Sequence, residues 1–154
     1  MPALAEHEVY RRIKALDIAP VLRVINKLDF ADSAGVCAHV TKPGSVAPPE
    51  LLWLIASLGL GGKTKRLFCR KLMPRQSIPP HVDDWMPEEA NWRRFQVPLT
   101  SHPDIIMRWP NDGIETHLEP GYLYEVRFDR THEVVHAADV DRIHMQIDQV
   151  DATI

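Results

Sequence analysis

Cysteine is scarce in this sequence, and its scarcity excludes one class of metal site. Cys37 and Cys69 are the two cysteines among the 154 residues, and no C-x-x-C pair occurs. A cysteine-rich zinc site needs closely spaced thiolate ligands, so we expect none here. Two isolated cysteines are typical of a reducing compartment, which predicts a cytoplasmic protein.

Long apolar runs and an excess of positive charge are missing as well. The longest apolar stretch, residues 51–60, is too short to cross a bilayer. The charged first residues lack the apolar segment of a signal peptide, so we expect neither a signal peptide nor a membrane partner. The formal net charge is -3, which argues against a broad nucleic-acid surface, because such a surface needs an excess of Lys and Arg.

The composition that is present predicts a globular protein. Apolar residues make up 45% of the chain and charged residues 25%, which is typical of a soluble domain. The length predicts one domain over residues 1–154. Thirteen prolines favour a loop-rich β protein over a helix bundle. We expect residues 1–65 to form a helical and loop N-terminal part and residues 66–154 to form a β core.

The N-terminal part is predicted to contain two or three helices. Val9, Ile13 and Leu16 recur at helical spacing and predict a helix over Glu6–Leu16. Residues 21–28 suit a strand or a short helix, and residues 29–48 a loop with one strand at 36–40. A third segment, Glu50–Leu58, has proline before it and Gly59 after it, which predicts a helix with both ends marked.

Beyond Lys65, short runs of β-forming residues alternate with turn residues. The predicted strands are Arg66–Met73, Arg94–Leu99, Asp104–Trp109, Gly121–Phe128 and Arg142–Val150. Turns are predicted at residues 111–113 and 119–121. This pattern predicts a mainly β fold, a double-stranded β-helix of the jelly-roll or cupin-like kind.

One short motif in the β region can bind a metal. In His81-Val82-Asp83 the first and third side chains point to the same face of a strand. A histidine from a distant strand, such as His132, would complete a set of two imidazoles and one carboxylate. Such a set leaves three octahedral positions open, which suits Fe(II). H-x-D is common by chance, and a surface pair with an unrelated core histidine is the alternative.

Several longer motifs follow one another along residues 68–150. They are Pro74-Arg75-Gln76-Ser77-Ile78-Pro79-Pro80-His81, then Arg94-Phe95-Gln96-Val97-Pro98-Leu99, then Glu119-Pro120-Gly121-Tyr122-Leu123-Tyr124, and finally residues 132–148 with Arg142 ten positions after His132. In this order they resemble the aspartyl/asparaginyl β-hydroxylase family. They are also similar to the related bacterial proline hydroxylases. Both groups are Fe(II)- and 2-oxoglutarate-dependent oxygenases.

The resemblance implies a role for each matching residue. His81, Asp83 and His132 would be the iron ligands. Arg142 would hold the distal carboxylate of 2-oxoglutarate, because a guanidinium offers a carboxylate two parallel donors. Arg94 matches a second family arginine near the cosubstrate.

The sequence departs from the family at two positions. An asparagine of the family is His136 here, and a histidine is Gln96, so both positions keep a hydrogen-bonding group. His136 is therefore a second candidate for the distal ligand, or a fourth ligand, although its offset to Arg142 fits less well than that of His132.

Several residues near these motifs allow a second interpretation. Arg142 can instead form a surface salt bridge with Asp139 or Asp141. Arg93 and Arg94 are neighbours, so we expect one of them to face solvent. His144 shares a strand face with Arg142, and that face either lines a pocket or meets water. Residues 82–91 form an acidic segment after the motif and are predicted to cover the site as a lid.

These patterns predict an enzyme that hydroxylates a C–H bond with Fe(II), O2 and 2-oxoglutarate, releasing succinate and CO2. The predicted substrate is a small molecule, an amino acid or a short peptide, of the Asp, Asn or Pro type. A cupin metalloenzyme that uses the same ligands without 2-oxoglutarate is the first alternative. A non-catalytic jelly-roll binding module is the second.

Overall fold

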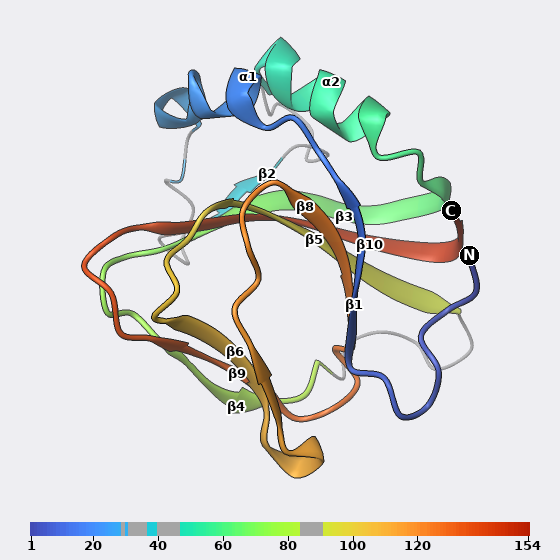
Figure 1. The fold of residues 1–154 in the computed structure, drawn as a ribbon. Helices are drawn as coiled ribbons and strands as arrows, with labels where there is room; N and C mark the ends of the chain where they lie inside the picture. The colour runs from blue at the N-terminus through green and yellow to red at the C-terminus, as the bar shows by residue number, and fades with distance from the viewer. Residues whose placement is uncertain (29, 31–36, 40–46, 84–90) are drawn as a thin grey trace.

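Two antiparallel β-sheets face each other, and helices cover the outer face of the larger sheet (Figure 1). The computed structural model describes residues 1–28, 30, 37–39, 47–83 and 91–154. The larger sheet has six strands in the order β1 (Tyr10–Ala15), β8 (Tyr122–Val126), β5 (Trp92–Thr100), β10 (Arg142–Thr153), β3 (Gly61–Leu72) and β2 (Cys37–His39). The smaller sheet has four strands in the order β4 (Ile78–His81), β9 (His132–His136), β6 (Ile105–Trp109) and β7 (Ile114–Thr116).

The helices are few and short. They are α1 (Ala19–Leu22), α2 (Pro49–Ser57) and the 3-10 turns η1 (Ile25–Lys27) and η2 (Pro110–Asp112). The predicted mainly β, jelly-roll or cupin-like fold with a few N-terminal helices is thus confirmed. In the part of the chain that the structure describes, no helix has the length and apolar character needed to cross a membrane.

The main apolar core lies between α2 and the larger sheet. Leu51 and Leu54 of α2, with Leu58 directly after the helix, are buried against this sheet. Strand β10 contributes alternate residues, Ile143, Met145 and Ile147, to the same core. Because side chains alternate along a strand, the residues between them project from the opposite face, toward the smaller sheet. That opposite face is where the polar residues of β10 lie.

The N-terminal prediction was wrong in one element. Residues 6–16 were expected to form a helix, but Tyr10–Ala15 form strand β1, which pairs with β8 at the edge of the larger sheet. The register shifts between Arg12 and Lys14, as in a β-bulge. A bulge changes the face on which the following side chains lie. Val9, which precedes β1, packs between the sheets, whereas Ile13, at the bulge, packs on the helix side. These residues therefore do not share the one apolar face that a helix would give them.

Most of the remaining predicted elements are confirmed. The helix at 50–58 corresponds to α2, residues 21–28 are helical in part, and all five predicted strands are present, with β3 beginning earlier, at Gly61. Strand β4 was not among the strands predicted from runs of β-forming residues, although His81 was expected on a strand; Pro79 and Pro80 lie within β4. It occupies the edge of the smaller sheet, where missing amide donors are tolerated. The predicted lid falls largely on residues 84–90, which lie outside the described residues.

Candidate metal centre and its cavity

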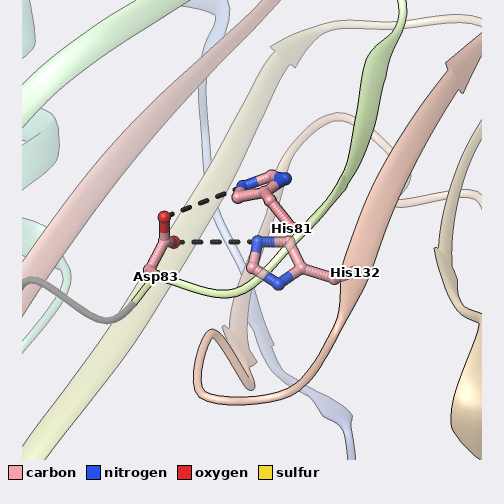
Figure 2. Close-up of side chains that lie close together, drawn as sticks. All are labelled: His81, Asp83 and His132. Carbon is pink, nitrogen blue, oxygen red and sulfur yellow. Dashed lines mark ion pairs between the residues drawn. The ribbon is translucent and has the colours of Figure 1, made fainter.

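Three side chains meet at one end of the space between the sheets (Figure 2). His81 ends β4, His132 begins β9, and the two residues are direct partners across this strand pair. Asp83 lies just beyond β4, where its backbone amide donates to the carbonyl of Phe128 at 3.1 Å. One potential ligand atom from each side chain lies within 4.8 Å of those of the other two. The structure therefore brings together the three residues predicted as metal ligands.

The two imidazoles are oriented in the same way. Nδ1 of His81 lies 2.8 Å from the carbonyl oxygen of Pro79, and Nδ1 of His132 lies 2.8 Å from that of Arg130. A carbonyl can only accept, so each Nδ1 carries the proton and each Nε2 keeps a lone pair. Both Nε2 atoms lie 3.7 Å from the Asp83 carboxylate (Figure 2). This tautomer is the one that a metal ligand requires.

Electrostatics keep His132 and Asp83 in the forms that bind a metal. Burial lowers the pKa of His132, which keeps its imidazole neutral at pH 7. Burial alone would raise the pKa of Asp83, but Arg94 and the two histidines outweigh it and hold that pKa below its ordinary value. A neutral imidazole at His132 and an ionised carboxylate at Asp83 are donors that fit a divalent cation.

Arg94 links the Asp83 carboxylate to the larger sheet. Its guanidinium donates to Asp83. It also donates through Nε and Nη2 to the two carboxylate oxygens of Asp148, at 2.7 and 3.1 Å. Asp148 is fully buried, and the Gln146 amide donates to it at 3.2 Å. Arg94 is thus held by two carboxylates, and its predicted contact with the cosubstrate stays a prediction.

The expectation that Arg93 or Arg94 faces solvent was wrong. Arg93 projects to the other side of β5 and forms a bidentate ion pair with Glu125, at 2.7 and 2.8 Å. Both arginines are 5% exposed. Each one is buried with a carboxylate partner, which is the condition under which a charge is tolerated in a protein interior.

A cavity extends from the three-residue cluster along the polar face of the larger sheet. Its volume is about 60 Å³, enough for a few water molecules or the end of a small ligand. The lining residues are Arg66, Arg70, Ile78, His81, Asp83, Arg94, Gln96, Met107, His132, Val134, Arg142, His144 and Gln146. Polar side chains thus come from β3, β5 and β10, and the cluster comes from β4, β9 and the residues that follow β4.

Arg142 is buried in this lining without a counter-ion. Its exposed fraction is 4%, and within the described ranges no carboxylate pairs with it. The interpretation as a surface salt bridge is excluded, because Asp139 pairs with Arg75 and Asp141 with Lys71. Burial and the nearby Arg70 lower the pKa of Arg142 to about 9. The guanidinium is still charged at pH 7 and is available to a carboxylate that enters the cavity.

Two more histidines lie near Arg142 but away from the metal cluster. Nδ1 of His144 lies 3.1 Å from Oε1 of Gln96, and its Nε2 is buried without a hydrogen-bond partner. Burial, with Arg142 next, lowers the pKa of His144 well below the ordinary value. His136 is buried, and its Nδ1 accepts from the amide of Ala138 at 3.4 Å. His136 is not part of the cluster of ligand atoms.

Two residues of the site were missed from the sequence. Asp148 lies on the predicted strand at 142–150, but its pairing with Arg94 depends on the register between β5 and β10. Arg70 alternates with the core residue Cys69 on β3 and lines the cavity. Alternation along the strands could have placed both residues on the polar face, but not beside these partners.

Comparison with known proteins shows which fold this is. No family model and no curated protein matches the chain. Its structure is similar to viral collagen prolyl hydroxylase vCPH from Paramecium bursaria Chlorella virus-1, with TM-score 0.65 at 12% identity over 97% of this chain and 94% of that one. A prolyl-4-hydroxylase of Pseudomonas putida gives TM-score 0.57 at 16% identity over 92% and 86%.

A third likeness is to an oxidoreductase of the 2OG-Fe(II) oxygenase family from Burkholderia pseudomallei, with TM-score 0.57 at 14% identity over 91% of this chain and 84% of that one. At such identities the likeness shows the fold, whereas activity depends on the site. The resemblance to the aspartyl/asparaginyl β-hydroxylases in particular stays a prediction. The chain has the fold of the 2OG-Fe(II) oxygenases, with a His-Asp-His cluster at one end of the space between its sheets.

Proposed function

We propose that this protein is an Fe(II)- and 2-oxoglutarate-dependent oxygenase that hydroxylates an amino acid, free or within a peptide. The observation that carries the proposal is the cavity itself. A three-residue set of metal donors and a buried guanidinium without a carboxylate partner line the same small space. A metal alone would not need the guanidinium, and a simple anion would not need the donors.

The cluster fits an iron site in its chemistry as well as its geometry. His81, Asp83 and His132 would hold the metal through two Nε2 atoms and one carboxylate oxygen. This donor set is the facial triad of non-haem Fe(II) oxygenases, which leaves positions open for further ligands. Fe(II) with 2-oxoglutarate supplies O2 activation, coupled to decarboxylation of the cosubstrate to succinate and CO2.

The remaining residues orient and hold these groups. Arg94, held in turn by Asp148, keeps the Asp83 carboxylate ionised and directed toward the two imidazoles. Arg142 would bind the distal carboxylate of 2-oxoglutarate, because a buried cation without a counter-ion gains most from an anion that enters. The apolar side chains of Ile78, Met107 and Val134 exclude water from the same cavity.

The proposal is tested by anaerobic titration of the purified protein with Fe(II) and then with 2-oxoglutarate. Chelation of protein-bound iron by 2-oxoglutarate produces a weak visible metal-to-ligand band. We expect this band in the wild type, no band in Asp83→Ala, and a higher 2-oxoglutarate requirement in Arg142→Gln. Asp141→Ala is the matched control, since this exposed carboxylate pairs with Lys71 outside the cavity.

Each of the two rival functions predicts a different result in this titration. Tight iron binding without any band, unchanged by Arg142→Gln, would favour a cupin metalloenzyme that does not use 2-oxoglutarate. The absence of tight iron binding would favour a binding module. Either result would overturn the proposal. A band that persists in Asp83→Ala would overturn the assignment of this carboxylate as a ligand.

A further inference from the structure

Arg70 is a second cavity arginine that the proposed chemistry does not use. It lies on β3 directly opposite His144 of β10 and lines the cavity. Its Nε is buried without a hydrogen-bond partner. In the portion of the chain that the structure describes, no carboxylate pairs with it. An arginine at the wall of a cavity with an unsatisfied buried donor is suited to bind an anion that enters from outside.

An aromatic ring holds the Arg70 guanidinium in place. The guanidinium carbon of Arg70 lies 5.6 Å from the centroid of the Phe68 ring, and that of Arg66 lies 4.8 Å from the same ring. The side chain of Phe68 is fully buried and cannot move aside. Stacking of this kind orients a guanidinium and leaves its edge free for hydrogen bonds. Arg66 and Arg70 thus place two positive charges over one ring.

The charges around the cavity do not balance once the proposed cofactors are bound. Arg66 lies 3.9 Å from Asp148 and is left out of the count. The other lining arginines are Arg70, Arg94 and Arg142, and the described carboxylates beside them are those of Asp83 and Asp148. A divalent metal and doubly charged 2-oxoglutarate cancel each other, so one positive charge remains. Positive charge in a confined cavity favours a further anionic ligand.

We propose that Arg70 is the substrate-carboxylate contact of this cavity, so that the hydroxylated substrate is a small molecule with a free carboxylate. This proposal rests on the proposed function and narrows its substrate class. Arg142 is accounted for by the distal carboxylate of the cosubstrate, and Arg94 by Asp83 and Asp148. Arg66 lies 3.9 Å from Asp148, whereas no described carboxylate pairs with Arg70. Arg70 is also half-buried where Arg142 is buried, which suits a ligand that binds after the cosubstrate.

The competing arrangement is a clamp in which Arg70 and Arg142 hold the same cosubstrate carboxylate. The two guanidinium groups are close enough for Arg70 to lower the pKa of Arg142. The two arrangements differ in how many anions bind. A separate site binds a second carboxylate after 2-oxoglutarate has saturated the protein, whereas a clamp binds none.

The experiment uses the protein loaded with Zn(II) and saturated with 2-oxoglutarate. Acetate and its neutral counterpart acetamide are the probes, and saturation-transfer NMR on their methyl groups measures binding. The variants are Arg70→Gln and Arg70→Lys. Arg108→Gln is the control, because it removes the same charge from an exposed site on β6. The Fe(II)-dependent visible band of each variant is recorded first.

We expect acetate to bind the saturated wild type at least about tenfold more tightly than acetamide, which is the effect of losing one charge-assisted hydrogen bond. Arg70→Gln should remove this preference, Arg70→Lys should retain part of it, and Arg108→Gln should leave it intact. The affinity for 2-oxoglutarate should stay within about threefold in Arg70→Gln.

Two results would overturn the inference. Equal binding of acetate to the wild type and to Arg70→Gln would show that Arg70 contacts no second carboxylate. A loss of 2-oxoglutarate affinity in Arg70→Gln as large as that in Arg142→Gln would assign Arg70 to the cosubstrate. The visible band recorded before any acetate is added tests the proposed function by itself. If that function is wrong, the wild type shows no band.

Discussion

Arg142→Met should make the metal-free protein more stable while removing its affinity for 2-oxoglutarate. The wild-type guanidinium is buried and meets no counter-ion among the described residues, so the folded state carries an unfavourable charge. Methionine fills a similar space with no charge. Replacing a buried charge with an apolar side chain often stabilises a protein for this reason.

The size of the effect follows from the pKa of Arg142. A fall from 12.5 to about 9, at about 1.4 kcal/mol for each tenfold change, corresponds to roughly 5 kcal/mol of unfavourable free energy. Both folded and unfolded chains are protonated at pH 7, so the whole of this cost is present there and is relieved only above about pH 9. Relaxation of the cavity around the charge reduces this cost. We therefore expect Arg142→Met to raise the free energy of unfolding by about 1 to 3 kcal/mol.

Thermal unfolding with and without ligand measures both parts of this prediction. A gain of this size raises the Tm of a chain of this length by roughly 2 to 10 °C. With Zn(II) present, 2-oxoglutarate should raise the Tm of the wild type and have no effect on Arg142→Met. The exposed replacement Arg108→Met is the control. A variant that is less stable than the wild type when metal-free, yet still stabilised by 2-oxoglutarate, would refute the reasoning.

Three further predictions concern the polar face of the larger sheet and the cluster beside it. Asp148→Asn leaves Arg94 with one carboxylate and should lower the free energy of unfolding by about 3 to 5 kcal/mol, measured by urea titration; a loss below about 1 kcal/mol would contradict the role given to this pair. The lowered pKa of His144 means that its share of stability is present above the unfolded value of 6.5 and is lost as the pH falls below it. From pH 7.5 to 5.5 this loss is on the order of 1 kcal/mol, so the free energy of unfolding should fall by about that much less in His144→Gln than in the wild type, and equal falls would contradict this prediction. Asp83→Ala should form no succinate in a coupled assay, and full turnover would exclude it as a ligand.

The sequence contained the main features of the fold because they depend on local patterns. A run of β-forming residues at 142–150 predicted β10, alternation placed Arg142 and His144 on one of its faces, and proline and glycine marked both ends of α2. The helix predicted over 6–16 failed because a bulge in β1 gives apolar residues a spacing that a straight strand does not have. His81 was expected on a strand, but the runs of β-forming residues did not define the bounds of β4, whose prolines are tolerated because it lies at a sheet edge.

Some residues of the candidate site could likewise be predicted from local patterns, and others could not. His81 and Asp83 were expected on one face of a strand, but β4 ends at His81 and Asp83 lies beyond it, so strand alternation is not what brings them together. His132 was found through the order of longer motifs. The pairing of Arg94 with Asp148 joins residues 54 positions apart. Such a contact depends on which strands are neighbours and in what register, and these are properties of the whole fold.

Because His81 pairs directly with His132, metal affinity at this site depends on the register between β4 and β9. The two Nε2 atoms converge because β4 and β9 meet at this one register. A slip of a single residue would send one imidazole to the opposite face. An insertion of one residue within β9 should therefore abolish tight metal binding even where the sheet still forms. Metal affinity could thus report, in loop or hinge variants, whether this edge of the smaller sheet has assembled correctly.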